Sequence, residues 1–483
     1  MQTQKNIFYN VLLAISQVLF PLITFPYLAR VLGPDNIGKL NFAESIAKYF
    51  ILLAALGIPI YGVREIAKKL NSKKELTLLF FEIFFINLIT TIFLTIVFSI
   101  AIYFFPALSQ EKELFKWAVL YFIFQLFYFE WFFIGVKEFK YIALRSFFIR
   151  FLFIVFVFLF IQEKQDYIYY MIMQVILSAI ICVINFSRLN SLLDFKHINF
   201  TEINLSKHLK PLLILFLTIF SISIYFSLDT IFLGFLANNE SVGYYSSALK
   251  LTKLIIAILG SITVAVFPQM IDVYQNGGEE QFKILVKKCF DLIVGLSIPL
   301  ILVLVGLSNE IVELFLGHSF QRAIVPLVIT APLVLIVSLS SIFGFQVLSA
   351  LSKDKSILVS ALMGMSVSIL LSFLLIPSLK ENGAAITILI TELTVSVSFI
   401  YFANKYFSLE GYLNLFFIKV LESIPYLLII IICKLFSNFF LFTIISSCIL
   451  SGLWFFLYHF YIRPENIYKE QADKFLNKLN HKS

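Results

Sequence analysis

Long apolar runs alternate with short polar connections along the whole chain. About fourteen runs approach the roughly 20 apolar residues that a helix needs to cross a bilayer. Their approximate first residues are Ile7, Leu40, Leu76, Phe115, Ala143, Tyr167, Leu212, Tyr244, Cys289, Ala323, Ser356, Gly383, Leu415 and Phe439. The pattern predicts an all-α integral membrane protein with about fourteen transmembrane helices, whose even number places both termini on one side.

The second run carries charges where a membrane helix should already be under way, in the stretch "ARVLGPDNIGKLNFAESIAKYF". Glu44 and Lys48 are four residues apart, so they share one face of this helix in the acid-before-base order that helices favour. Counted from Leu40, Lys48 would lie about 12 Å inside the outer surface. Two interpretations stay open here: a neutralising ion pair, or a Lys48 side chain that faces a central cavity.

Composition and charge fit this class of protein. The chain is 60% hydrophobic and 17% aromatic, and its mean hydropathy is +0.94. Of its 37 Lys and Arg residues, 24 fall on the side of the N-terminus and 7 on the other side if spans alternate from the first run. The positive-inside rule then places both termini in the cytoplasm. Because topology explains the net charge of +8, no nucleic-acid partner is expected.

The sequence also contains a weak internal repeat. A shift of 205 residues lays "LGPDNIGKLNFAESIAK" on "ANNESVGYYSSALKLTK", so that Gly38 meets Gly243 and Lys48 meets Lys253. Six spans separate the copies, which predicts two parallel-repeat bundles, an architecture that transporters use. The predicted parts are an N-terminal six-helix bundle at 1–188, a cytoplasmic linker at 189–210, a C-terminal six-helix bundle at 211–408, two appended helices at 409–462 and a basic cytoplasmic tail at 463–483.

Charged residues inside apolar runs are the candidate site residues, because a charge at mid-bilayer costs about 2.5 to 3.5 kcal/mol and should face protein or water. The cations among these candidates are Lys48, Lys250, Lys253, Arg30 and Arg150, and of these Lys48 and Lys253 could face one cavity from opposite halves. The acids among these candidates are Glu44, Asp229, Asp291 and Glu392. For Arg150 an ion pair with Glu130 is the competing structural interpretation.

Motifs for catalysis or cofactor binding do not occur in the sequence. It has no GxxxxGK[ST] phosphate loop and no GxSxG, and its five histidines lack the spacing of metal ligands. The four cysteines lie in apolar runs without a CxxC pair. We therefore expect no enzyme activity, no cofactor and no metal site.

The segment "FPYLARVLGPDNIGKLNFAESIAKYF", followed by "LGIPIYGVREIAKK", resembles the start of bacterial polysaccharide transporters of the Wzx type. These flippases share a superfamily and a MATE-like fold with multidrug and toxin extruders and the lipid II flippase. The resemblance implies an inner-membrane flippase that moves an undecaprenyl-diphosphate-linked oligosaccharide repeat unit to the periplasmic leaflet, as in O-antigen biosynthesis. For such a cargo, the resemblance implies that the candidate cations contact phosphate or acidic sugar. H+ or Na+ coupling, with the four candidate acids as its sites, and partnership with a polysaccharide polymerase and a chain-length regulator stay open.

Three alternatives are compatible with the same sequence. An ion-coupled multidrug exporter would favour an acidic cavity, which the intramembrane lysines argue against. Export of lipid II would use the same diphosphate chemistry. A non-transporting scaffold for a polysaccharide polymerase would tolerate neutralisation of the buried charges.

Overall fold

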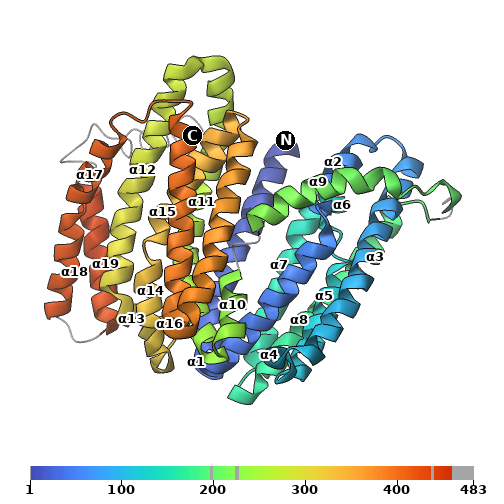
Figure 1. Ribbon diagram of the computed structural model, residues 1–483, viewed down its shortest axis with the longest axis horizontal. Coiled ribbons are helices and arrows are strands. Elements are labelled where there is room, and N and C mark those ends of the chain that lie inside the picture. Colours follow the sequence, from blue (N-terminus) through green and yellow to red (C-terminus); the bar gives the residue numbers. More distant parts are fainter. Residues whose placement is uncertain (1, 196–199, 224–227, 437–439, 459–483) are drawn as a thin grey trace. The chain divides into compact units, whose positions relative to one another are not determined.

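The computed structural model describes residues 2–195, 200–223, 228–436 and 440–458, and these segments contain helices and connections without any β-strand (Figure 1). The all-α prediction is confirmed. The chain forms two compact units, residues 1–243 and residues 244–483. Each unit is described separately below.

The first unit contains ten α-helices and the start of an eleventh, among the residues that the structure describes. They are α1 (Gln2–Ala55), α2 (Ile58–Lys68), α3 (Lys73–Phe104), α4 (Pro106–Ser109), α5 (Lys112–Gln125), α6 (Glu130–Gly135), α7 (Phe139–Phe160), α8 (Tyr167–Leu192), α9 (Ser206–Ser223), α10 (Leu228–Leu236) and the start of α11 (Asn239–Asp272). Short 3₁₀ turns, η1 (Lys164–Asp166) and η3 (Phe200–Glu202), lie in the connections. Helix α1 packs on α5 and α7, and α8 packs on the same two helices.

The second unit holds the rest of α11 and the following helices. These are η5 (Val273–Gly277), α12 (Gly278–Gly306), α13 (Ser308–Phe315), η6 (His318–Ala323), α14 (Ile324–Thr330), α15 (Leu333–Ser340), η7 (Ser341–Leu348), α16 (Asp354–Asn404), α17 (Tyr412–Glu422), α18 (Ile424–Phe436) and α19 (Phe440–Leu457). Helix α12 lies at the centre of this unit and contacts α15, α17 and α18.

Within the described residues, eight helical stretches are long and apolar enough to cross a membrane, and a bent pair at 318–348 makes nine. Three of the eight each contain two of the apolar runs, with a break at Gly33, at η5 or at Lys380, where φ is 50°. Each interruption falls between two of the apolar runs in the sequence. The predicted count of about fourteen spans therefore agrees roughly with the structure.

The break inside α1 determines where the charged helix begins. Gly33 has φ 74° and ψ 174°, a conformation that L-residues with a side chain rarely adopt, and Pro34 follows it. Proline suits the first position of a helix because its N–H would have no partner there. We call residues 34–55 the second arm of α1. This arm starts well before Leu40, the start expected from hydropathy.

Helix starts in the structure follow the shift that relates the two copies of the sequence repeat. Pro34 begins the second arm of α1 and Asn239 begins α11, while Lys73 begins α3 and Gly278 begins α12. The agreement ends there, because the next helices of the two copies no longer start at equivalent positions. The repeat is therefore visible in the starts of two helices of each copy, although α2 separates these helices in the first copy.

Gly38 and Gly243, which the repeat pairs, make reciprocal close contacts in the first unit. A Cβ on Gly38 would lie 1.6 Å from the carbonyl oxygen of Asn239, and one on Gly243 would lie 1.9 Å from that of Pro34. Pro34 and Asn239 are themselves equivalent positions of the repeat. The two glycines thus allow the starts of two repeat-related helices to touch through their backbones.

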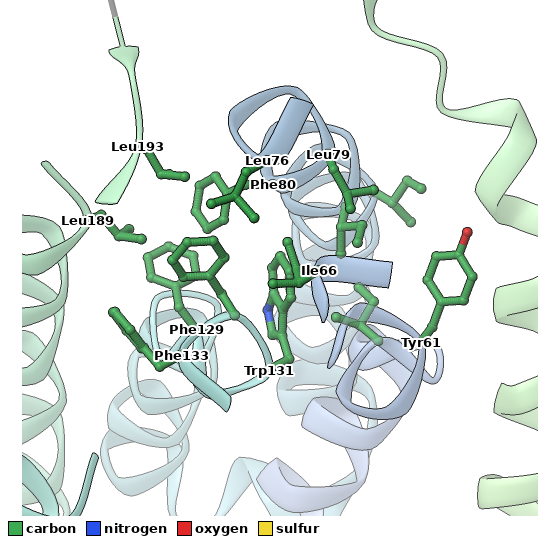
Figure 2. Packing of buried hydrophobic residues seen from close by; sticks show 14 of the residues in the cluster. Tyr61, Ile66, Leu76, Leu79, Phe80, Phe129, Trp131, Phe133, Leu189 and Leu193 are labelled. Carbon is green, nitrogen blue, oxygen red and sulfur yellow. The ribbon is translucent and has the colours of Figure 1, made fainter. Parts of the chain in front are cut away.

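An aromatic core fixes α2, α3 and α6 in the first unit (Figure 2). The Phe80 ring stacks on Trp131 at 5.7 Å and meets Phe132 edge-on at 5.1 Å, both measured between ring centroids. Gly62 allows this packing, since a Cβ there would lie 2.5 Å from the Trp131 ring. These contacts hold the amphipathic α2 against α3 and α6.

The predicted boundaries between bundles, linker and appended helices remain a prediction. The division of the structure at residue 243 places α9 and α10 in the first unit, whereas the repeat-based boundary assigns residues from 211 onward to the second bundle. Part of the linker, 196–199, and the basic tail at 463–483 lie outside the described residues.

Candidate functional site

The Glu44 carboxylate is held by donors from two helices of the first unit. Its Oε1 accepts hydrogen bonds from the Tyr170 hydroxyl at 3.0 Å and from Nε2 of Gln174 at 2.6 Å, both on α8. Its Oε2 accepts from the Lys48 ammonium at 2.9 Å, one turn along the same arm of α1. Helical spacing predicted the pair with Lys48, whereas the two α8 donors come from 126 and 130 residues away.

Burial divides this ion pair unequally. The Glu44 side chain is 13% exposed and that of Lys48 is 59% exposed. Measured along the helix axis from Pro34, Lys48 lies about 21 Å into the arm, which is deeper than the 12 Å expected from Leu40. An exposed ammonium this far along an apolar helix requires water or a polar ligand, because lipid would not solvate it.

The other candidate cations differ in their exposure. Arg30, Lys250 and Lys253 are exposed, and Arg150 is partly buried. Lys253 is as far from the start of α11 as Lys48 is from the start of the second arm of α1, so the two lysines occupy the same turn of repeat-related helices. That these cations contact one substrate stays a prediction.

Glu130 bonds to Arg145 of α7, a partner that the sequence did not indicate. Nη2 of Arg145 donates to Glu130 at 2.9 Å, and its Nη1 donates to the Asn185 amide oxygen at 2.7 Å. Arg145 is buried, with 2% of its side chain exposed, and its guanidinium lies over the Tyr141 ring. The interpretation that paired Glu130 with Arg150 did not include Arg145, which lies closer to the start of α7.

The four candidate ion-coupling acids lie in different surroundings. Asp229 at the start of α10 and Glu392 in α16 are buried, at 1% and 4% exposure. Glu44 carries the hydrogen bonds described above. Asp291, in α12, lies in an ion pair. Their role as proton or sodium sites stays a prediction.

Asp291 belongs to a three-residue charge cluster of the second unit. The Lys419 ammonium of α17 lies 3.1 Å from Asp291 Oδ1 and 3.0 Å from Glu422 Oε2. Only 4% of the Lys419 side chain is exposed, against 19% for Asp291 and 11% for Glu422. This lysine ties α17 to α12 and is enclosed by protein.

A fourth cluster joins residues 204–208 to α3 within the first unit, and no motif in the sequence indicated it. Glu82 of α3, 1% exposed, accepts from Lys207 Nζ at 2.7 Å and from the Asn204 amide at 2.9 Å. Its other oxygen lies 3.0 Å from Nε2 of His208, whose Nδ1 is 2.6 Å from the Tyr61 hydroxyl. Glu82 was recognisable as a charge in an apolar run, but its partners lie far away in the sequence and share no spacing with it.

Among the described residues, no group of three His, Cys, Asp or Glu side chains is arranged to hold a metal ion. The clusters described above consist of fixed charges and hydrogen bonds inside apolar helices.

A family model described as "Polysaccharide biosynthesis protein" matches residues 3–273, which is more than half of the 483-residue chain. The chain belongs to this family. The resemblance to polysaccharide transporters is thereby confirmed at the level of the family. With its apolar helices, this member of the family is a multi-pass membrane protein.

Two relatives carry the same printed name, "Putative O-antigen transporter". The protein from Escherichia coli (strain K12) is 28% identical over 406 residues, covering 83% of this chain and 97% of that protein. The protein from Shigella dysenteriae is 22% identical over 394 residues, covering 81% of this chain and 98% of that protein. The similarity thus extends over almost the full length of both relatives.

Solved structures of low sequence identity share the fold. "Lipid II flippase MurJ, inward closed conformation" superposes with a TM-score of 0.75 at 16% identity, over 94% of this chain and 99% of that one. An inward-facing multidrug resistance MATE family transporter of the MOP superfamily gives 0.62 at 15% identity, over 82% and 98%. The predicted MATE-like fold is confirmed, and at these identities the likeness concerns the fold alone.

Proposed function

We propose that this protein is a flippase for undecaprenyl-diphosphate-linked oligosaccharide repeat units of a surface polysaccharide. It moves them from the cytoplasmic to the periplasmic leaflet of the bacterial inner membrane by alternating access, with both termini in the cytoplasm. The family, the two full-length O-antigen relatives and the basic residues on the side of the N-terminus support this proposal.

The observation that carries the proposal is the exposed ammonium of Lys48 on an apolar helix. Its carboxylate partner Glu44 is buried and accepts hydrogen bonds from α8. The acid is therefore fixed in place, whereas the ammonium of Lys48 is accessible to a ligand. A diphosphate is the part of the cargo that needs a fixed cation, and the oligosaccharide needs polar surroundings. The undecaprenyl chain can stay in lipid.

Coupling and partners form the less constrained part of the proposal. An H+ or Na+ gradient could drive the cycle through Glu44, Asp229, Asp291 or Glu392. A polysaccharide polymerase and a chain-length regulator are the expected protein partners, because the flipped repeat unit is their substrate.

Reconstitution in liposomes with an undecaprenyl-diphosphate oligosaccharide tests the function. A membrane-impermeant lectin reports how much sugar becomes exposed on the outer surface with time. We expect flipping by the wild type and at least about a tenfold slower rate for Lys48→Ala and for Lys253→Ala, since a charge-assisted contact contributes about 1.5 to 3 kcal/mol.

Lys69→Ala is a matched control, because Lys69 lies in the connection after α2 and bonds the exposed Glu75. It should flip at the wild-type rate. If the wild type does not flip the lipid-linked oligosaccharide but exports drugs, or only binds a polymerase, the proposed cargo is wrong. Full activity of both lysine variants would refute their contact with the diphosphate.

A further inference from the structure

The two carboxylate oxygens of Glu44 accept hydrogen bonds from different helices. Oε2 takes the Lys48 ammonium, whereas Oε1 takes both donors from α8, Tyr170 and Gln174. These α8 residues are four apart and therefore lie on one helix face. The carboxylate thus keeps two hydrogen bonds that do not depend on Lys48.

This division changes what happens when Lys48 leaves its partner. A buried carboxylate that loses its cation is strongly destabilised when it has neither water nor a donor. Here the Tyr170 hydroxyl and the Gln174 amide continue to solvate Glu44. The 59% exposure of Lys48 lets its ammonium reach another anion by rotating its flexible side chain.

We propose that Glu44 is an internal competitor for a diphosphate at Lys48, and that Tyr170 and Gln174 are positioning residues that keep Glu44 satisfied while Lys48 holds the ligand. The inference rests on the proposed flippase function and adds a means of release. When the Glu44–Lys48 ion pair forms again, it displaces the diphosphate from the ammonium. Affinity is thereby kept moderate, as a carrier that must release its cargo requires.

The competitor model predicts opposite effects for two changes around the same carboxylate. Glu44→Gln removes the competing charge and should tighten binding of undecaprenyl diphosphate about threefold to fivefold, the value of an exposed ion pair. The double change Tyr170→Phe with Gln174→Leu removes both α8 donors and makes Glu44 depend more strongly on Lys48. It should weaken binding about tenfold, since bonds to charged groups are the strong ones.

Binding of undecaprenyl diphosphate to the full-length protein in nanodiscs, measured by native mass spectrometry over a concentration series, tests these effects. Lys48→Met should lose at least about tenfold in affinity. Tyr167→Phe is the matched control, because this hydroxyl lies on the same helix but donates to Glu111 at 2.8 Å. It should bind like the wild type.

The same variants in the liposome assay separate binding from release. Glu44→Gln should reach half-maximal flipping at a lower cargo concentration and show a lower maximal rate, because the diphosphate leaves more slowly. A merely structural role of Glu44 would lower the maximal rate without tightening binding.

A ligand-free readout checks the positioning role by itself. Acylation of the Lys48 amine by an N-hydroxysuccinimide ester, followed by peptide mass spectrometry, should be faster in Glu44→Gln and slower in the Tyr170→Phe, Gln174→Leu variant. If the wild type binds and flips while all these variants bind alike, the competitor model is overturned and the flippase function stands. If the wild type binds no undecaprenyl diphosphate, both are overturned.

Discussion

Two ion pairs inside apolar helices, one in each unit, use the same chemistry with opposite burial. At Glu44 and Lys48 the acid is enclosed and the lysine side chain is 59% exposed. At Lys419 the lysine is enclosed, at 4% exposure, by two acids from α12 and α17. The position of the lysine therefore separates a cation that can meet a ligand from one that serves to join helices.

The difference follows from how each charge is solvated. Lys48 donates to an acid that already has two other donors, so the pair can open without leaving a bare charge. Lys419 has no comparable exposure, and Asp291 and Glu422 both direct an oxygen at its ammonium. Opening that cluster would leave charges without water, which low-dielectric surroundings make unfavourable.

Lys419→Met should give the largest loss of stability. It leaves two mostly buried carboxylates facing each other, and breaking a buried pair in this way lowers the free energy of unfolding by about 3 kcal/mol. The loss appears as a lower Tm of the detergent-solubilised protein and a smaller monodisperse fraction. Lys434→Met on α18 is the control, because Lys434 is 39% exposed beside Glu310 and its loss should matter less. Equal stability of Lys419→Met and wild type would break the comparison.

Lys48→Met should have the opposite profile to Lys419→Met, with a large loss of transport and a small loss of stability. Transport should fall at least about tenfold, while the Tm stays close to that of the wild type, since an exposed ion pair contributes about 0.2 to 1 kcal/mol. Lectin exposure and thermal unfolding of the same preparation give the two values. A Tm loss as large as that of Lys419→Met would show that Lys48 is also a structural lysine.

The sequence predicted the features that depend on short spacing or on direct self-comparison. Apolar runs indicated the helices, and the internal repeat indicated the matching starts of α11 and the second arm of α1. The Glu44–Lys48 pair was visible because its members lie one helical turn apart. Hydropathy alone placed the start of that arm too late, at Leu40, and the Gly33–Pro34 pair is the signal that could have placed it correctly.

What the sequence could not supply is pairing between distant helices. Tyr170 and Gln174 are ordinary polar residues of an apolar run, and nothing in their spacing connects them to Glu44. Asp291 and Lys419 were both recognisable as charges, yet their long separation along the chain hid the pair. For Glu130 two arginines lay within reach, and only tertiary packing shows that the buried Arg145 is a partner.

Removing all three charges of the Asp291–Lys419–Glu422 cluster should restore most of the stability that is lost when Lys419 alone is replaced. The variant Asp291→Asn, Lys419→Met, Glu422→Gln keeps the shapes and leaves none of the three charges behind, so its free energy of unfolding should lie within about 1 kcal/mol of the wild type. Thermal unfolding beside Lys419→Met measures the recovery. If the triple variant is as unstable as the single one, Lys419 stabilises the unit through packing of its stem rather than through its charge.

The smallest difference in stability is expected between two isosteric changes, Glu44→Gln in the first unit and Glu422→Gln in the second. Glu44→Gln leaves behind a lysine that is 59% exposed and can be hydrated, so the free energy of unfolding should change by no more than about 0.5 kcal/mol. Glu422→Gln leaves behind an enclosed lysine that still has Asp291 beside it, and the loss should be about 1 kcal/mol, that of one hydrogen bond to a charged group. The two Tm values, measured in one detergent, distinguish them. Equal Tm shifts would mean that the exposure of the lysine does not determine how much its acidic partner contributes to stability. The distinction between Lys48 as a ligand-binding cation and Lys419 as a structural cation would then rest on transport data alone.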